Sequence, residues 1–209
     1  MKHLLKMSDL TPDEVAHILD VADELKAQQK AGGTEPLLKG KSVALMFSKN
    51  STRTRTSFEV GVYQLGGLGN YMNAATELQS GRGEPLKDTA RVLGRYYDCV
   101  VWRTYRQSDL EEFAEFAGVP VINGLTDYAH PCQVLADLMT IRERRGALVS
   151  WKPAKSRRRL SLSEVPGAAV FQTAVTTTSA SLTPSAGSSS RRNALPYLWA
   201  NISTSAAGR

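Results

Sequence analysis

The chain has 209 residues, of which 42% are hydrophobic and 22% are charged, and this is enough for one substantial core. The net charge of +6 is uneven: residues 1–150 hold 18 basic and 19 acidic residues, whereas residues 151–209 hold 8 basic residues and one acidic residue. The first 150 residues therefore give no reason to expect nucleic-acid binding. No apolar run approaches the ~20 residues of a membrane span, and the N-terminus turns polar too soon for a signal peptide, so we expect a cytoplasmic protein without membrane contacts.

The N-terminal part carries a clear helix signal. Thr11 can cap a helix, Pro12 fits its first position, and Glu14 can close a capping box. Apolar residues then recur at helical spacing. The pattern predicts an amphipathic helix over residues 12–28.

Strands and helices alternate along the following part of the chain. The runs SVALMF at 42–47 and CVVW at 99–102 are short, continuous and apolar, which is typical of buried parallel strands. The other predicted elements, in chain order, are a helix through 58–65, a strand near 70–73, a helix over 85–96, a helix over 110–117, a strand over 119–122, a turn at Asn123-Gly124 and a helix over 131–141. This alternation favours an α/β fold in which helices flank a parallel sheet.

The two cysteines show no metal-binding pattern. Cys99 and Cys132 fit no metal-binding spacing, and Cys99 is expected to be a buried free thiol.

In residues 151–209, 17 of the 59 side chains are Ser or Thr, and no helical or strand period is sustained. Such a chain buries too little apolar surface to offset its ordering entropy. We therefore expect a folded domain over 1–148 and a disordered or aberrant basic tail over 149–209.

The stretch FSKNSTRTRTSFEVG, residues 47–61, crowds hydroxyl groups and two arginines between a predicted strand and a helix. A helix N-terminus offers unpaired N–H groups, the hydroxyls of Ser51 and Thr52 add donors, and arginine forks suit phosphate oxygens. Positions 53 and 55 cannot point the same way on a helix, so we assign Arg53 to a ligand and Arg55 to a structural partner. The stretch predicts a phosphate or carboxylate site, with a capped surface helix as the alternative.

The segment STRTR at 51–55, followed by Phe58 and Glu59, resembles the carbamoyl-phosphate loop of the aspartate and ornithine carbamoyltransferases. Three further stretches occur in the family's order: GRGE at 81–84, Arg103 at the end of a buried strand, and HPCQ at 130–133. HPCQ resembles the ornithine branch, since the aspartate enzymes usually read HPTQ. The resemblance covers roughly residues 1–148, the carbamoyl-phosphate-binding half of the family.

The resemblance implies a transferase of one-carbon groups. It would move the carbamoyl group of carbamoyl phosphate to the δ-amine of ornithine, giving citrulline and phosphate in arginine biosynthesis. Positioning and oxyanion stabilisation suffice for this chemistry, so we expect no cofactor and no metal. The carbamoyl-phosphate-binding residues that it implies are Ser51, Thr52, Arg53, Thr54, Arg55, Gln79, Arg103, His130 and Gln133.

Individual roles follow from the same resemblance. Arg103 and His130 would act catalytically by polarising the carbonyl oxygen, and Gln133 would accept a hydrogen bond from the carbamoyl amide. Gln79 would contribute in trans within a homotrimer. From the residues alone, an ion pair at the sheet edge for Arg103 and a helix cap for His130 remain alternatives. Cys132 is expected to start a helix rather than act as a nucleophile.

The resemblance ends near residue 148. The family's second domain supplies the amino-acid site through DxxxSMG and HCLP stretches, and neither stretch is present. We hypothesise that the chain is truncated and that a frameshifted tail replaces the second domain. We then expect the chain to bind carbamoyl phosphate weakly and to transfer the carbamoyl group to ornithine at a negligible rate. A non-catalytic carbamoyl-phosphate-binding module, a carbamoyltransferase for aspartate or another amine, and nucleic-acid contact by the basic tail are the alternatives.

Overall fold

The computed structural model describes residues 3–33, 35–78 and 83–146. The expected tail over 149–209 and the expected site residue Gln79 lie outside these residues. None of the helices in the described part is long and apolar enough to cross a membrane.

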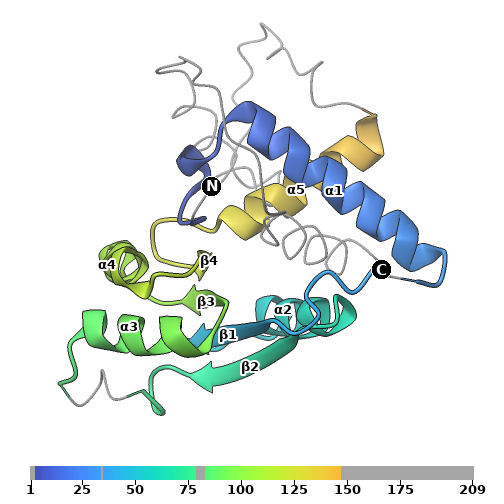
Figure 1. The fold of residues 1–209 in the computed structure, drawn as a ribbon. Coiled ribbons are helices and arrows are strands. Elements are labelled where there is room, and N and C mark those ends of the chain that lie inside the picture. Colours follow the sequence, from blue (N-terminus) through green and yellow to red (C-terminus); the bar gives the residue numbers. More distant parts are fainter. Residues whose placement is uncertain (1–2, 34, 79–82, 147–209) are drawn as a thin grey trace, which may run out of the picture.

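Helices and strands alternate as the sequence predicts (Figure 1). In chain order the elements are the 3-10 helix η1 (Met7–Asp9), α1 (Pro12–Lys30), β1 (Ser42–Phe47), α2 (Arg53–Gln64), β2 (Leu68–Asn73), α3 (Leu86–Tyr96), β3 (Cys99–Arg103), α4 (Gln107–Ala117), β4 (Val121–Leu125) and α5 (Pro131–Arg145). The Thr11 hydroxyl accepts from the Glu14 N–H at 3.2 Å, so α1 starts at the expected capping box. The four strands form one parallel sheet in the order β2-β1-β3-β4.

Helices cover both faces of the sheet, which confirms the α/β fold class. Figure 1 shows α1, α2 and α5 on one side of the sheet and α3 and α4 on the other. Alternate residues of β1 enter the two cores: Leu45 belongs to the buried cluster that contains Phe58 and Leu135, while Met46 belongs to the cluster that contains Phe113. β1 and β3 are therefore buried on both faces, which explains their continuous apolar sequences.

The strand order places a topological switch point between β1 and β3, at the carboxyl edge of the sheet. The chain passes from β1 out to β2 and then returns across β1 to form β3. As a result α2 leaves the carboxyl end of β1 toward one face, whereas α4 leaves the carboxyl end of β3 toward the other. Ligand sites in open α/β sheets form at such a switch point, outside the carboxyl ends of the strands.

The predicted turn at Asn123-Gly124 is wrong, because both residues lie inside β4. Asn123 is fully buried, and its backbone N–H donates to the carbonyl of Leu4 at 2.9 Å. Its side-chain oxygen accepts from the N–H of Leu125 at 2.8 Å. Arg103 pairs with Leu125, which is a register shift of one residue relative to the preceding pairs. Tertiary partners and this bulge thus replace the turn that the Asn-Gly dipeptide favours by itself.

Helices α3 and α4 approach each other closely at Gly94. A Cβ atom placed on Gly94 would lie 1.7 Å from the carbonyl oxygen of Ala117, the last residue of α4. A backbone carbonyl at this distance cannot move aside without shifting the helix. Gly94 is therefore required by the packing of the two helices that cover the second face of the sheet.

We expect Gly94→Ala to lower the free energy of unfolding by about 2–3 kcal/mol, because the helices must separate to admit the methyl group. Urea denaturation followed by circular dichroism measures this change. Gly33→Ala is the matched control, since a Cβ there has no neighbour within 4 Å, and it should change the value by less than about 0.5 kcal/mol. A Gly94→Ala protein as stable as the unmodified chain contradicts the close approach of α3 to α4.

Candidate functional site

The N-terminus of α2 lies directly after β1, at the carboxyl edge of the sheet. The helix begins at Arg53, so Thr54 and Arg55 belong to its first turn rather than to a preceding loop. The Ser51 hydroxyl accepts from the Arg55 N–H at 3.3 Å, while the Thr52 side chain caps nothing. No described residue accepts a hydrogen bond from the N–H groups of Arg53 and Thr54. The first turn therefore presents two free donors at the positive end of the helix dipole.

The two arginines of this turn have different surroundings. The Arg55 guanidinium carbon lies 3.6 Å from the centroid of the Tyr71 ring, and its Nε donates to Glu59 Oε1 at 3.2 Å. The Arg53 side chain is exposed and pairs with no residue in the described ranges. Arg55 therefore has structural partners, as expected from the sequence. The assignment of Arg53 to a ligand stays a prediction.

Arg103 and His130 come together although 27 positions separate them in the sequence. Arg103 ends β3, and its Nε is buried without a hydrogen-bond partner in the described part of the chain. His130 precedes α5, and its Nδ1 is likewise buried and unpartnered. Burial lowers the pKa of Arg103. Burial and, second, the Arg103 charge lower the pKa of His130 to about 4, so the imidazole is neutral at neutral pH.

The two structural alternatives for these residues have no support in the described part of the structure. No carboxylate there lies within ion-pair distance of Arg103, and the His130 side chain makes no capping hydrogen bond to α5. Buried polar atoms in native proteins usually have a partner, so each unsatisfied nitrogen calls for an explanation. An oxygen-bearing ligand at the sheet edge supplies one.

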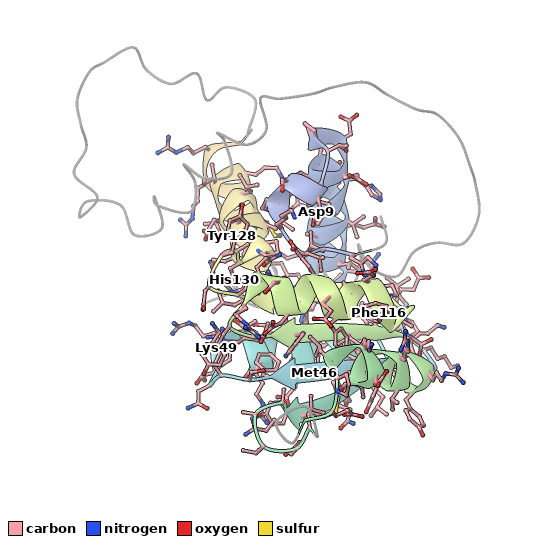
Figure 2. All side chains as sticks on the ribbon, turned by 90° about the vertical axis from the view of Figure 1, so that its left-hand side faces the viewer. Asp9, Met46, Lys49, Phe116, Tyr128 and His130 are labelled. Carbon is pink, nitrogen blue, oxygen red and sulfur yellow. The ribbon has the colours of Figure 1, made fainter. Side chains whose placement is uncertain are left out.

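Backbone hydrogen bonds hold the loops after β1, β3 and β4 together. The Ser48 N–H donates to the Arg103 carbonyl at 2.8 Å, and the Asp127 N–H donates to the Tyr105 carbonyl at 2.8 Å. The Lys49 ammonium forms an ion pair with Asp127 at 2.9 Å, which joins the first loop to the third. Figure 2 shows Lys49 and His130 on the same side of the molecule. The first turn of α2, Arg103 and His130 therefore share one edge.

The Lys49–Asp127 pair is a contact that the sequence did not reveal. Lys49 lies in the stretch 47–61, and its partner Asp127 is 78 positions away in the sequence. Its ammonium also lies 4.7 Å from the centroid of the Tyr105 ring. Local sequence patterns do not predict an ion pair between residues so far apart in the chain.

The first turn of α5 contributes Gln133 and Cys132. Gln133 is exposed, and its Nε2 donates to Asp137 Oδ1 at 2.9 Å, so its carbonyl oxygen remains available to accept a hydrogen bond. Cys132 is buried, and its thiol donates to the Asn123 carbonyl at 3.0 Å. Burial raises the pKa of Cys132 well above its ordinary value, which disfavours a nucleophilic thiolate. Burial also raises the pKa of Cys99 to about 12, in agreement with a buried free thiol.

The described residues contain no group of three or more His, Cys, Asp or Glu side chains that could hold a metal ion. The groups gathered at the sheet edge are instead hydrogen-bond donors, two guanidinium groups and a neutral imidazole. Such a set suits a ligand that carries an anion and a polarisable carbonyl.

Comparison with known proteins supports the family resemblance. The family model described as aspartate/ornithine carbamoyltransferase, carbamoyl-P binding domain, matches residues 2–143. The ornithine carbamoyltransferase of Carboxydothermus hydrogenoformans is 56% identical over 153 residues, which cover 73% of this chain and 49% of that protein. The chain spans about half the length of the curated relatives it matches.

Two solved structures share the fold over the same part of the chain. Ornithine carbamoyltransferase from Pyrococcus furiosus aligns with a TM-score of 0.68 at 51% identity, covering 70% of this chain and 46% of that one. The catalytic subunit of M. jannaschii aspartate transcarbamoylase aligns with a TM-score of 0.65 at 37% identity, covering 70% and 48%. Together with the family match over 2–143, these likenesses show that the chain belongs to the aspartate/ornithine carbamoyltransferase family.

Proposed function

We propose that this domain binds carbamoyl phosphate at the carboxyl edge of its sheet and serves as the donor-binding half of an ornithine carbamoyltransferase. One observation carries the proposal: the nitrogens of Arg103 and His130 that are buried without a partner among the described residues lie at the same edge as the N-terminus of α2. The ornithine branch is favoured because the named ornithine relatives reach 56% identity, compared with 37% for the aspartate transcarbamoylase subunit.

The phosphate group fits the first turn of α2. The free N–H groups of Arg53 and Thr54 point donors at an anion, and the dipole adds a favourable field. The Arg53 guanidinium, which pairs with none of the residues that the structure describes, offers two parallel N–H groups to phosphate oxygens. The hydroxyls of Thr52 and Thr54 add donors, and the Ser51 hydroxyl, whose oxygen accepts from Arg55, keeps its own hydrogen to donate.

The carbamoyl carbonyl fits between Arg103 and His130. When the δ-amine of ornithine attacks, the new C–N bond forms, negative charge grows on the carbonyl oxygen, and the C–O bond to phosphate then breaks. Arg103 and an N–H of the neutral His130 stabilise that oxygen, while Arg53 and the α2 N-terminus receive the phosphate that leaves. The attacking amine gives up one proton, which the departing phosphate accepts. The Gln133 oxygen accepts a hydrogen bond from the carbamoyl NH2 group.

The remaining family properties are part of the same proposal. We include a homotrimer, a contribution from Gln79 of a neighbouring subunit, a cytoplasmic location and a role in arginine biosynthesis. Gln79 lies outside the described residues. The division into a domain over 1–148 and a tail over 149–209 stays a prediction.

Isothermal titration calorimetry with carbamoyl phosphate tests donor binding. We expect Arg53→Ala to raise the dissociation constant about tenfold to a hundredfold, since a charge-assisted pair to phosphate is lost. Arg95→Ala is the matched control, because Arg95 is an exposed arginine in the last turn of α3, at the opposite edge of the sheet, and should have no effect. Equal losses in both variants, or no binding by the unmodified chain, contradict the assignment. A citrulline assay on the same preparation separates transfer from binding alone.

The environment of His130 predicts a dependence of stability on pH. Its folded-state pKa of about 4 lies below the ordinary value of 6.5, so the unfolded chain binds more protons between these values. The stability associated with a neutral His130 is thus complete above pH 6.5 and is lost as the pH falls toward 4, by about 2–3 kcal/mol. Urea titrations at pH 7 and 4.5 should show a smaller difference for His130→Gln, which does not titrate. An unchanged difference in this variant argues against a buried neutral imidazole.

A further inference from the structure

The loop of residues 126–129 leads directly into His130 and is closed by its own hydrogen bonds. The Thr126 hydroxyl oxygen accepts from the Ala129 N–H at 3.1 Å, and the Thr126 N–H donates to the Ala129 carbonyl at 3.0 Å. The His130 carbonyl then accepts from the N–H groups of Gln133 and Val134 at the start of α5. The backbone of His130 is therefore held on both sides.

Asn123 fastens the same loop to the N-terminal segment. Its Nδ2 donates to the Ala129 carbonyl at 3.2 Å and to the Leu5 carbonyl at 2.8 Å. Leu4 is fully buried beside β4, where its N–H donates to the Val121 carbonyl at 2.8 Å. The segment that precedes η1 thus takes part in holding the residue before His130.

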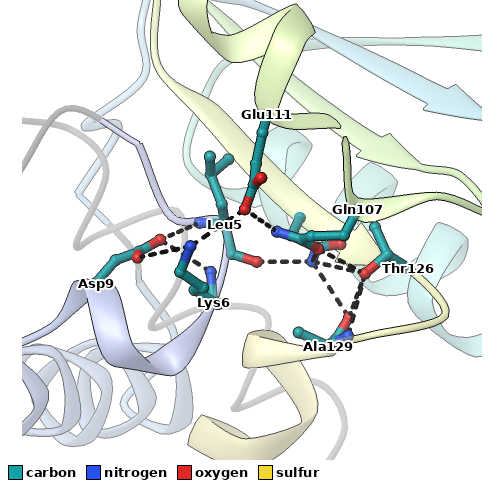
Figure 3. A network of polar contacts seen from close by, with 8 residues as sticks. Leu5, Lys6, Asp9, Gln107, Glu111, Thr126 and Ala129 are labelled. Carbon is teal, nitrogen blue, oxygen red and sulfur yellow. Dashed lines mark hydrogen bonds and ion pairs between the residues drawn. The ribbon is translucent and has the colours of Figure 1, made fainter. Parts of the chain in front are cut away.

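Gln107, the first residue of α4, lies at the centre of this network (Figure 3). Its Nε2 donates to Glu111 Oε1 at 3.2 Å, and the Thr126 hydroxyl donates to its Oε1 at 2.7 Å. Glu111 also pairs with Lys6 at 3.1 Å, and the Gln107 hydrogen bond followed by the Lys6 bond lowers the pKa of Glu111. The carboxylate is therefore ionised and only accepts hydrogen bonds.

This arrangement fixes the direction of each hydrogen bond. Because the Glu111 carboxylate only accepts, the Gln107 amide must turn its NH2 group toward it and its oxygen toward Thr126. The Thr126 hydroxyl then donates to the Gln107 oxygen at 2.7 Å in preference to the Ala129 carbonyl at 3.3 Å, and its lone pairs serve the Ala129 N–H. The exposed Glu111 carboxylate of α4 thus sets the orientation of the Gln107 amide, and the Gln107 oxygen in turn orients the hydroxyl that closes the loop before His130.

We propose that Gln107 is a positioning residue of the carbamoyl-phosphate site, which holds His130 beside Arg103 by way of the Thr126 hydroxyl. This inference rests on the proposed function. Without the Gln107 oxygen the Thr126 hydroxyl turns to its longer contact with the Ala129 carbonyl, its bond to the Ala129 N–H weakens, and the imidazole shifts relative to the bound carbonyl. Displacements of about 1 Å are enough to impair a site built on orientation.

The first test needs no ligand. Gln107→Met keeps the length of the side chain and removes both polar groups. In proton NMR titrations of the full chain we expect it to move the His130 ring resonances and to raise the pKa of His130 from about 4 toward its ordinary value, because the loosened loop admits water. Lys6→Met is the matched control, since it removes the outer ion pair and leaves the Gln107 oxygen in place. Unchanged His130 resonances in Gln107→Met overturn the proposal.

The second test is a double-mutant cycle with carbamoyl phosphate as the probe. Gln107→Met should raise the dissociation constant about threefold to tenfold, which corresponds to one lost hydrogen bond. In a His130→Gln background the same change should have no further effect, because Gln107 acts only through His130. Losses that add in the double variant overturn the positioning role.

Variants at Thr126 provide a second test of the same hydrogen bonds. If Gln107→Met fails to fold, Thr126→Val and Thr126→Ser replace it: the valine variant should reproduce the loss, and the serine variant, which keeps the hydroxyl, should restore the His130 resonances and the affinity. Equal behaviour of these two variants also overturns the proposal. If the unmodified chain binds no carbamoyl phosphate, the proposed function fails, whereas the NMR comparison still decides whether Gln107 positions His130.

Discussion

The parallel pairing of β1 with β3 is the constraint on which the candidate site depends. The two strands are adjacent in the sheet although α2, β2 and α3 lie between them in the chain. Their carboxyl ends carry the hydroxyl-arginine turn and Arg103, and the Ser48 N–H joins them through the Arg103 carbonyl at 2.8 Å. If this pairing slipped by one residue, Arg103 would turn to the other face of the sheet, because side chains alternate along a strand.

The arginines of the domain differ in the partners that their guanidinium groups have within the fold. Arg142 of α5 binds Asp20, Asp23 and the Leu19 carbonyl of α1, so it fastens two helices together. Arg55 is likewise engaged by Glu59 and Tyr71. The Arg55 guanidinium and the terminal nitrogens of Arg142 have thus reached partners within the fold, although the Arg142 Nε, like the Arg103 Nε, is buried without a partner in the described residues.

Arg53 and Arg103 differ from these structural arginines. The Arg53 guanidinium has no partner in the described residues, and the Arg103 Nε is buried and unsatisfied beside a neutral His130. Leaving a buried donor without an acceptor costs about 1–3 kcal/mol, so a fold keeps such atoms only where other interactions over-determine them. The hydrogen bonds around Asn123 and Thr126 supply that over-determination on the His130 side.

Local patterns were sufficient for the order and type of the helices and strands, because amphipathic period, capping residues and buried apolar runs are local properties. They failed at Asn123-Gly124, a dipeptide that favours a turn by itself. The partners that extend β4 through it, Leu4 and Leu5, lie 119 and 118 positions away from Asn123. The motifs named Arg103 and His130, but nothing in their spacing revealed that the two lie together or that their nitrogens lack partners.

Residues far apart in the sequence therefore divide the work of the site between them. The STRTR turn, Arg103 and His130 supply donors, and each sits in a recognisable motif. The groups that hold them in place are ordinary by sequence: a glutamine at the start of α4, a threonine in a loop and an asparagine in a strand. A positioning group needs only the correct hydrogen-bonding atoms at the correct distance. Many different residues can supply such atoms, so no sequence pattern marks them. For this reason the sequence could name the residues of the candidate site, whereas the network that holds them in place required the structure.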